Sequence, residues 1–308
     1  MKNYTFNYVK YFNCLGSECK HNCCTKWDVV IDKPTLKKYQ NLFKSDERFS
    51  SECFDENKFK LNESGRCPFL DDDNLCYIIK NYGEKALCKT CKTHPRFRSF
   101  FSSYAETGLG LCCEHAGKII LSFKPKMKLA SKKGDNFKPE RNAFEKKIFL
   151  FRNKALKIAQ SKNLTIYQKL ESLSELTDIN LFKKSYLLWT KTLLSLESLD
   201  EKEFSFNKLT AFNEWKALPQ NYDREFEQLL SYLIFRHVSR AIDQIDLRVR
   251  LSFVLLSIKI INQIYYLLAD FSFDGLVEAC RIYSSEIECS DDNLFILLNE
   301  IESLVSLI

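Results

Sequence analysis

The chain has 308 residues, with 45% hydrophobic and 28% charged side chains, a globular balance that excludes a largely disordered protein. Only eight glycines and six prolines occur, so a turn-rich all-β fold is not expected. The net charge of +6 is small and scattered, so it favours an acidic partner only weakly and gives no support to nucleic-acid binding.

The segment 1–12 is polar and rich in tyrosine, and it lacks the apolar stretch of a signal peptide. We therefore expect a cytoplasmic protein, whose thiols stay reduced. Thirteen cysteines occur, and eleven of them lie from Cys14 to Cys113. Such clustering in a reducing compartment favours metal ligation over a framework of disulfides. We expect the two later cysteines, Cys280 and Cys289, to pack as small apolar residues.

Most of the early cysteines fall into three groups. These are Cys14-x4-Cys19-x3-Cys23-Cys24, the run Cys67-x8-Cys76 followed by Cys88-x2-Cys91, and Cys112-Cys113. Short spacers let a loop wrap one metal ion, so the grouping predicts a metal site. Neighbouring side chains diverge, so one of Cys23 and Cys24 faces the core, or each serves a different metal of a multinuclear site. Thiolates bind both zinc and iron–sulfur clusters, and the spacing leaves this choice open.

Two nucleotide- or cofactor-binding motifs are absent from the sequence. The radical-enzyme arrangement Cys-x3-Cys-x2-Cys fails because Lys26 occupies the third position after Cys19 and Cys23. The closest approach to a glycine-rich nucleotide loop is Gly108-Leu-Gly110, which lacks the rest of the fingerprint. A doubly wound methyltransferase or dehydrogenase domain therefore has no support.

The sequence divides into three consecutive parts. Residues 1–120 carry the cysteine groups in irregular sequence. Residues 121–139 form a lysine-rich stretch with two prolines and a glycine, which we expect to connect two domains. Residues 140–308 carry apolar side chains at helical spacing. The predicted fold is therefore mainly α, with a small, loop-rich cysteine-cluster domain that binds metal, followed by a helical domain.

Three stretches show the helical pattern most clearly. In the first, apolar residues recur in steps of four and three at Phe144, Ile148, Phe151, Ala155 and Ile158. The stretches 226–238 and 295–304 repeat this spacing. His237 lies among apolar residues of the second stretch, so we expect a satisfied core or surface histidine.

The most apolar stretch of the chain is 251–268. It is interrupted by Lys259, Asn262 and Gln263, which a membrane span rarely tolerates. We therefore predict a buried helix and no contact with a membrane. Strand-like alternation is brief, as at Trp27, Val29 and Ile31.

The cysteine-rich region resembles a known family. The opening Phe12-Asn-Cys14-Leu-Gly16-x2-Cys19-x3-Cys23-Cys24-x2-Trp27-x-Val29-x-Ile31-Asp32 is similar to the start of the flagellin lysine-N-methylases. The similarity continues through Cys67-Pro68-Phe69-Leu70, Leu75-Cys76-x-Ile78, Gly83-Glu84 and Thr90-Cys91-x3-Pro95-Arg96. It extends more loosely to Tyr232-Leu-Ile-Phe235-Arg236-His237. Where the family tends to read Ser-Cys-Pro-Glu-Ala-Ala-Arg, this chain has Cys112-Cys113-Glu-His115-Ala-Gly117-Lys118.

The resemblance implies methyl transfer from S-adenosylmethionine to lysine ε-amino groups of flagellin, with a 4Fe–4S cluster taking part; zinc is the alternative metal. The family-matching cysteines, expected as metal ligands, are Cys14, Cys19, Cys23, Cys24, Cys67, Cys76, Cys91 and Cys113. Three other cysteines, Cys53, Cys88 and Cys112, fall outside the family pattern. The expected partner is flagellin as protein substrate, and the oligomeric state stays open.

Methyl transfer to lysine requires a neutral amine, because the protonated amine is no nucleophile, and a pKa of about 10.4 keeps it protonated in water. The enzyme must desolvate the amine or offer a base. Candidate catalytic bases in the motif region are His94 and His115. Candidate cofactor-binding residues are Arg96 and Trp27, although Trp27 also suits the core around a cluster.

Two readings without catalysis compete with an enzyme. The first is a zinc-stabilised binding module whose helical domain docks a partner. The second is a metal chelator or cluster carrier. The shared cysteine pattern of small zinc- or iron-chelating proteins keeps both open, whereas the long helical part argues against a bare chelator.

Overall fold

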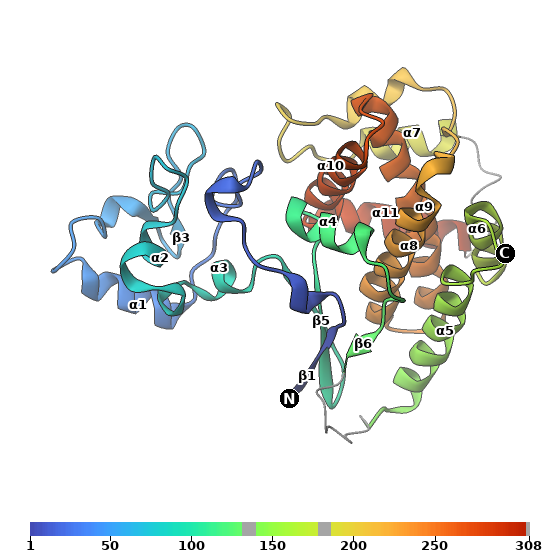
Figure 1. Cartoon of the computed structure of the whole chain (residues 1–308), viewed down its shortest axis with the longest axis horizontal. Coiled ribbons are helices and arrows are strands. Elements are labelled where there is room, and N and C mark those ends of the chain that lie inside the picture. Colours follow the sequence, from blue (N-terminus) through green and yellow to red (C-terminus); the bar gives the residue numbers. More distant parts are fainter. Residues whose placement is uncertain (131–139, 178–185, 306–308) are drawn as a thin grey trace. The chain divides into compact units, whose positions relative to one another are not determined.

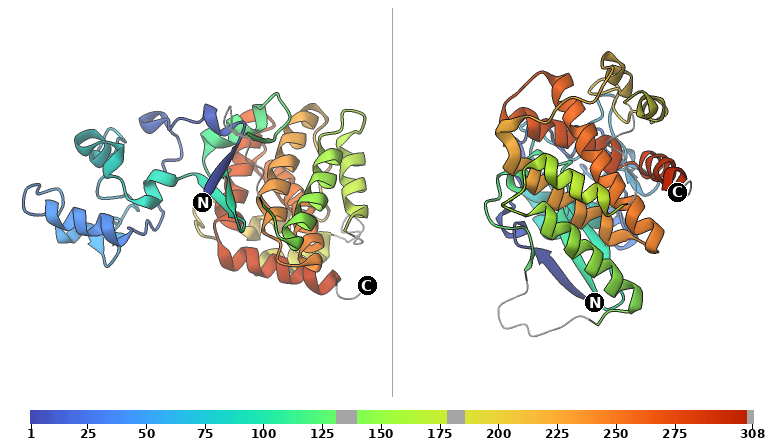
Figure 2. Two further views of the ribbon diagram at one scale, coloured as in Figure 1. Left: turned by 90° about the horizontal axis from the view of Figure 1, so that it is seen from below. Right: turned by 90° about the vertical axis from the view of Figure 1, so that its right-hand side faces the viewer.

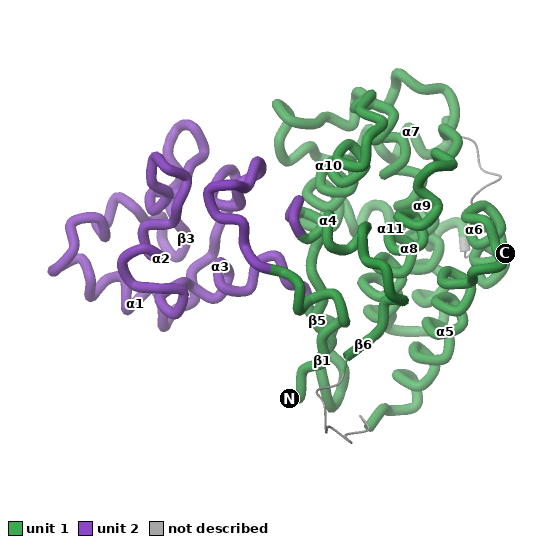
Figure 3. Tube along the Cα trace, viewed as in Figure 1, with its two compact units in different colours: residues 1–12, 98–112, 116–308 green, residues 13–97, 113–115 purple. Residues whose placement is uncertain are grey.

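The computed structural model of the chain describes residues 1–130, 140–177 and 186–305 (Figure 1). The chain forms two compact units (Figure 3). Unit 1 consists of Met1–Phe12, Arg98–Cys112 and Ala116–Ile308, and unit 2 consists of Asn13–Phe97 and Cys113–His115. The prediction of a mainly α fold is confirmed, because helices account for most of the regular structure.

Unit 1 contains a small mixed sheet that the sequence patterns did not predict. The strands run in the order β4 (Arg96–Phe100, whose first two residues belong to unit 2), β5 (Tyr104–Leu109), β1 (Lys2–Phe6) and β6 (Leu129–Ala130). β1 pairs with β5 in parallel and with β6 antiparallel. All six residues of β5 are buried, so this strand lies inside the unit.

Unit 1 contains the longest helices of the described residues. Its α-helices are α4 (Glu114–Ser122, whose first two residues belong to unit 2), α5 (Ala143–Ala159), α6 (Ile166–Glu175), α7 (Tyr186–Leu194), α8 (Asp223–His237), α9 (Gln244–Leu268), α10 (Phe273–Tyr283) and α11 (Asp291–Val305). A π-helical turn, Ser284–Glu288, joins α10 to α11. α9 packs against α8, α10 and α11, and α5 packs against α8 (Figure 2).

The stretch 251–268 is the buried helix predicted from the sequence. It lies in α9, which is long and apolar enough to cross a membrane, but 78% of its most apolar window is buried inside the protein. Two of its buried amides are hydrogen-bonded: the side-chain amide of Asn262 donates to the Lys216 carbonyl at 2.8 Å. Gln263 accepts from the Lys216 amide at 3.1 Å. These bonds offset part of the cost of burying the two polar side chains in the core of unit 1.

The three helical patterns correspond to α5, α8 and α11. α5 starts at a capping box, in which the Asn142 side chain accepts from the Glu145 amide and Glu145 accepts from the Asn142 amide. In α8, Phe226, Leu229 and Leu233 are fully buried, as their spacing predicts. α11 is less completely covered, because Phe295 remains 64% exposed.

Unit 2 is loop-rich. Its regular elements within the described residues are short: α1 (Lys33–Leu42), β2 (Phe54–Asp55), β3 (Lys58–Phe59), α2 (Tyr77–Tyr82) and α3 (Lys89–Thr93). Its core is an aromatic cluster that includes Tyr39, Phe49 and Phe69. Val29 and Ile31 are buried there, but the alternation around them forms only an isolated bridge between Val30 and Lys58.

The two units divide the chain differently from the three consecutive parts 1–120, 121–139 and 140–308. Residues 1–12 and 98–112 belong to unit 1 because β1 and β5 pair with each other. The expected connector is structured where it is described, since α4 extends to Ser122 and β6 pairs with β1. Residues 131–139 of the connector lie outside the described residues.

Candidate functional site

Backbone hydrogen bonds in unit 2 bring distant cysteines together. The Cys67 amide donates to the Cys24 carbonyl at 2.8 Å, which aligns the first and second cysteine groups. Leu70 and Cys76 form an antiparallel bridge, so the chain turns back between Cys67 and Cys76. The Tyr77 amide donates to the Phe69 carbonyl at 2.8 Å and closes this turn.

The Cys88-x2-Cys91 pair is positioned by the first turn of α3. Asp32 accepts from the Lys89 amide at 2.8 Å and also caps α1 through the Thr35 amide. The neighbouring Cys91 thiol lowers the pKa of Cys88 to about 7 against the opposing effect of burial. Cys88 is fully buried in the aromatic core.

Together these contacts form an inner thiol group, defined as Cys24, Cys67, Cys76, Cys88 and Cys91. Burial raises the pKa of Cys67 to about 12, with smaller effects from Cys76 and Cys88. The pKa of Cys91 is raised by its interaction with Cys88, by burial, and by the charges of Cys88, Cys24 and Cys67. Several half-buried thiols with raised pKa values therefore lie close together. A bound cation lowers the pKa of such thiols and converts them into thiolates.

An outer thiol group, defined as Cys19, Cys23 and Cys113, lies beside an imidazole and a carboxylate, the side chains of His21 and Glu114. The Cys19 thiol donates to the His21 carbonyl at 3.4 Å. Glu114 accepts from the Lys20 amide at 3.3 Å and lies 3.9 Å from His21 Nε2. Burial, followed by the charges of Glu114 and Cys113, raises the pKa of Cys19 to about 12.

Cys23 and Cys24 are adjacent in the chain but act on different cysteines. Cys23 acts electrostatically on Cys19 and also on Cys76 of the inner group. Cys24 acts on Cys91. The two groups therefore adjoin each other through Cys23.

The donor chemistry of both groups fits a thiophilic metal. Sulfur ligands favour zinc or iron–sulfur clusters over magnesium or calcium. Among the described residues, no three cysteine sulfurs lie within 4.8 Å of one another. A single zinc ion with four thiolates at about 2.3 Å would set its sulfurs about 3.8 Å apart. The thiols are therefore spread more widely than the ligands of one zinc ion.

Two further early cysteines, Cys14 and Cys53, are not members of the inner or the outer thiol group. Cys14 is exposed, and its sulfur accepts from the Gly16 amide at 3.5 Å. Cys53 donates to the Arg48 carbonyl at 3.3 Å. Cys88, which the family pattern left out, belongs to the inner group, and the Cys-x2-Cys spacing was the signal for it. His21 was also missed, although its place between Cys19 and Cys23 is typical of a ligand.

Three of the four predicted catalytic and cofactor-binding residues occur together in unit 2. The rings of Trp27 and His94 meet edge to face with centroids 6.1 Å apart. Burial, followed by the nearby charge of Arg96, lowers the pKa of His94 to about 4, so its imidazole is neutral at pH 7. His115 lies on another segment, next to Glu114 at the start of α4.

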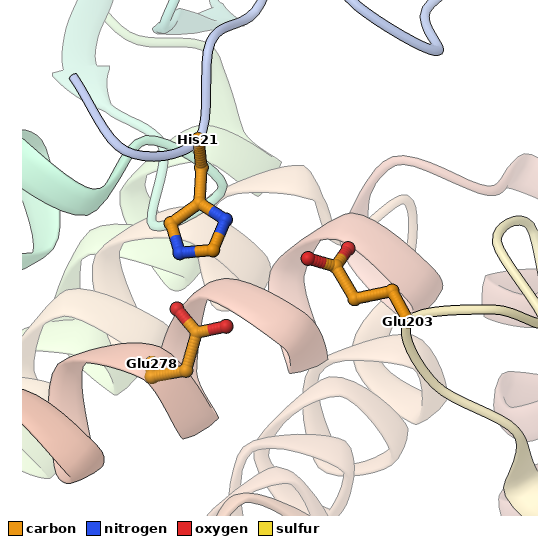
Figure 4. A group of neighbouring side chains, drawn as sticks. All are labelled: His21, Glu203 and Glu278. Atoms are coloured by element: carbon orange, nitrogen blue, oxygen red, sulfur yellow. The ribbon is translucent and has the colours of Figure 1, made fainter. Parts of the chain in front are cut away.

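Two neighbouring carboxylates in unit 1 form ion pairs with the same arginine. Glu203 and Glu278, labelled in Figure 4, both bind the Arg281 guanidinium, at 2.5 Å and 2.7 Å. Because Arg281 is buried, the carboxylates of Glu203 and Glu278 compensate for the hydration that its positive charge has lost. His21, drawn in the same view, belongs to unit 2, where it contacts Glu114.

Comparison with known proteins places the chain in a family. No protein-family model matches it, and no solved structure does. The flagellar biosynthetic protein FliU of Salmonella muenchen is 33% identical over 138 residues, which are 41% of this chain and 80% of FliU. The lysine-N-methylases of Salmonella choleraesuis and Salmonella typhimurium are 33% identical over 137 residues, 41% of this chain but only 34% of their own length. The chain belongs to the family of FliU and these lysine-N-methylases.

Proposed function

We propose that the protein methylates lysine side chains of flagellin, with S-adenosylmethionine as methyl donor and an iron–sulfur cluster bound by unit 2. The names of the relatives support lysine methylation and a flagellar role. The observation that carries the proposal is the inner thiol group, because it gathers cysteines from three separate segments around one place in unit 2.

The inner thiol group would hold the cluster. A cluster needs four cysteine ligands and the inner thiol group has five sulfurs. One of the five cysteines would therefore pack against the protein without binding iron. When bound, the cluster would supply positive charge that keeps its thiolate ligands ionised.

The chain's own side chains would prepare the lysine amine. A base with a pKa of about 4 cannot hold the proton of an amine whose pKa is about 10.4. His94 and Trp27 would therefore act as a dry aromatic wall that disfavours the ammonium form and holds the amine in line with the methyl group. Arg96 would bind the carboxylate of the methyl donor. His115, half-buried beside Glu114, remains the candidate base.

A methylation assay tests this function. Flagellin, S-adenosylmethionine with a labelled methyl group and the anaerobically purified protein are incubated together, and the flagellin is analysed by mass spectrometry. The proposal expects label on lysine side chains, in proportion to the metal content of the preparation. Flagellin without methyl-lysine, from a preparation with full metal content, would contradict it.

A zinc-stabilised binding module is the second candidate. It is favoured by the outer thiol group, where three cysteines lie beside the His21 imidazole and the Glu114 carboxylate, a mixed donor set that zinc accepts. Stoichiometric zinc without iron, together with flagellin binding but no methyl transfer, would make this candidate the better one.

A further inference from the structure

The lysine segment, defined as residues 124–128, lies between α4 and β6 in unit 1. Its sequence is Lys-Pro-Lys-Met-Lys, and all three lysines are exposed to solvent. Phe123, just before the segment, and Met127 within it are buried. The segment therefore packs onto unit 1 through apolar side chains and presents its lysines at the surface.

The first two carbonyls of the lysine segment are bound by α8. Arg224 donates to the Lys124 carbonyl, and Gln228 donates to the Pro125 carbonyl at 3.4 Å. Arg224 is itself exposed, so its guanidinium adds to the positive charge of the lysines. A cation therefore anchors the start of a segment that is already cationic.

The other three carbonyls are bound by residues next to α5 and β1. Gln160, directly after α5, donates to the Met127 carbonyl at 2.9 Å. Asn7, directly after β1, donates to the carbonyls of Lys126 and Lys128, at 3.0 Å each. The chain then continues into β6, which pairs with β1 (Figure 1). All five carbonyls therefore have a donor, and the lysines extend from a fixed backbone.

Lys10 and Tyr11 extend the cationic surface at the start of the segment. The Tyr11 ring contacts the Phe123 ring, with centroids 6.1 Å apart. Lys10 Nζ lies 4.9 Å from the centroid of the Tyr11 ring. Because Tyr11 is 54% exposed, its ring offers a partner an apolar contact beside the lysines.

The lysines of the segment have no acidic partner within the part of the chain that the structure describes. None of the three forms an ion pair with a described carboxylate. In contrast, Lys118 on α4 pairs with Asp274 at 3.0 Å. The chain from the first to the third lysine spans at most about 14 Å. Like charges held this close repel one another, so a partner with negative charge stabilises them.

We propose that the lysine surface, defined as the lysine segment together with Lys10 and Tyr11, binds an acidic segment of a partner protein. Carboxylates at alternate positions of an extended chain lie on one side, about 7 Å apart, which matches lysines two residues apart. Ammonium groups are compact charges that need no fixed carboxylate geometry. The fixed backbone reduces the entropy lost on binding. The proposal does not depend on methyl transfer.

Two other anionic partners fit the lysine surface less well. A membrane-binding surface combines basic residues with apolar side chains that enter the bilayer. In the described stretches 7–12 and 118–130, Tyr11 is the one large apolar side chain that is exposed. Single-stranded nucleic acid is bound by several aromatic rings that stack on successive bases, and this surface has one such ring. An acidic protein segment requires neither feature.

Binding of a defined acidic peptide tests the surface. The probe is a fluorescein-labelled peptide in which glutamate alternates with serine, and the control probe has glutamine in place of glutamate. The full-length protein, purified with its metal, is titrated into each probe, and fluorescence anisotropy is recorded at low and at high salt. The proposal expects saturable binding of the glutamate probe, at least about tenfold weaker binding at high salt, and no binding of the glutamine probe.

Matched variants locate this binding on the lysine segment. Replacing its three lysines by glutamine should weaken binding of the glutamate probe by at least about tenfold, because three ion pairs are lost. Replacing them by arginine keeps the charge and should retain binding. The control variant removes the same charge from three exposed lysines of α5 and should bind as the original protein does. Its substitutions are Lys146→Gln, Lys154→Gln and Lys157→Gln.

Lysine footprinting of the original protein gives a result that does not depend on how a variant folds. Lysines are acetylated with and without the glutamate probe and then mapped by mass spectrometry. Lys124, Lys126 and Lys128 should become less reactive with the probe, and the lysines of α5 should not change. Equal binding of the two probes, or equal weakening in the two glutamine variants, would show that the proposal is wrong. Tighter binding of phosphatidylserine vesicles or of a single-stranded oligonucleotide through the same lysines would also overturn it.

Discussion

Arg152 and Glu106 form a doubly hydrogen-bonded ion pair inside unit 1, with Nη1–Oε2 at 2.6 Å and Nη2–Oε1 at 3.0 Å. Glu106 lies on β5 and Arg152 on α5, and both are nearly inaccessible to solvent. Arg152 Nη1 also donates to Ser239 at 2.6 Å. This pair joins the small sheet to the helices of unit 1.

The first prediction concerns this pair. Arg152→Met should lower the free energy of unfolding by about 3–5 kcal/mol, because it leaves the Glu106 carboxylate buried without a counter-charge. Urea unfolding followed by circular dichroism measures the loss. Lys118→Met is the matched control, since its exposed pair with Asp274 should contribute at most about 1 kcal/mol. Equal losses in the two variants would contradict the structural role of the buried pair.

The second prediction concerns acid stability. Burial alone would raise the pKa of Glu288, but Arg236, His237 and Ser284 outweigh it and lower the pKa to about 2. A carboxyl with a depressed pKa in the folded state stabilises the protein above its unfolded value of 4.5, and this contribution is lost as the pH falls towards 2. It amounts to about 3 kcal/mol at most.

The free energy of unfolding is measured at a series of pH values for the original protein and for Glu288→Gln. The variant has no carboxyl to protonate at this position, so the comparison tests the predicted loss of stability at low pH. The original protein should be the more stable of the two at pH 7. The difference between them should narrow as the pH falls from 4.5 to about 2. A difference that stays constant across this window would show that the Glu288 carboxylate is not stabilised in the fold.

The third prediction concerns Cys88. As a member of the inner thiol group, it should contribute to metal binding although the family pattern omits it. Cys88→Ser should lower the metal content per chain, measured by elemental analysis of the anaerobically purified variant. Cys280→Ser is the control, because Cys280 is fully buried on α10 in unit 1 and should leave the metal content unchanged. Full metal content in Cys88→Ser would show that Cys88 does not contribute to metal binding.

The fourth prediction separates the two histidines. If His115 is the base, His115→Ala should slow methylation by about 10²-fold or more at unchanged metal content. If His94 acts as an aromatic wall, His94→Phe should retain most of the activity and His94→Ala should lose it. Rates of flagellin methylation, normalised to bound metal, give the comparison. Undiminished turnover in both alanine variants would exclude both residues from the mechanism.

The helical part of the fold could be predicted because its signal is local. Steps of three and four place Phe226, Leu229 and Leu233 on one buried face of α8 without reference to other elements. The sheet could not be predicted in this way. β1 gains its hydrogen bonds from β5, about a hundred residues further on, and its first residues, Lys2 and Asn3, carry no apolar pattern. The same long-range pairing brings residues 1–12 and 98–112 into unit 1, which no local pattern indicates.

The candidate site was predictable in composition but not in its grouping. Spacing predicts the cysteines as metal ligands, yet spacing cannot show that Cys24 meets Cys67 through a backbone hydrogen bond.

The most direct test of the proposed function is the metal itself. The protein is purified anaerobically, and its absorption spectrum, iron, sulfide and zinc are measured on the same sample. A cluster held by the inner thiol group predicts a thiolate-to-iron charge-transfer band, iron and sulfide in matching amounts, and loss of both in Cys67→Ser. A colourless protein with stoichiometric zinc and no iron would contradict the cluster-dependent methylase.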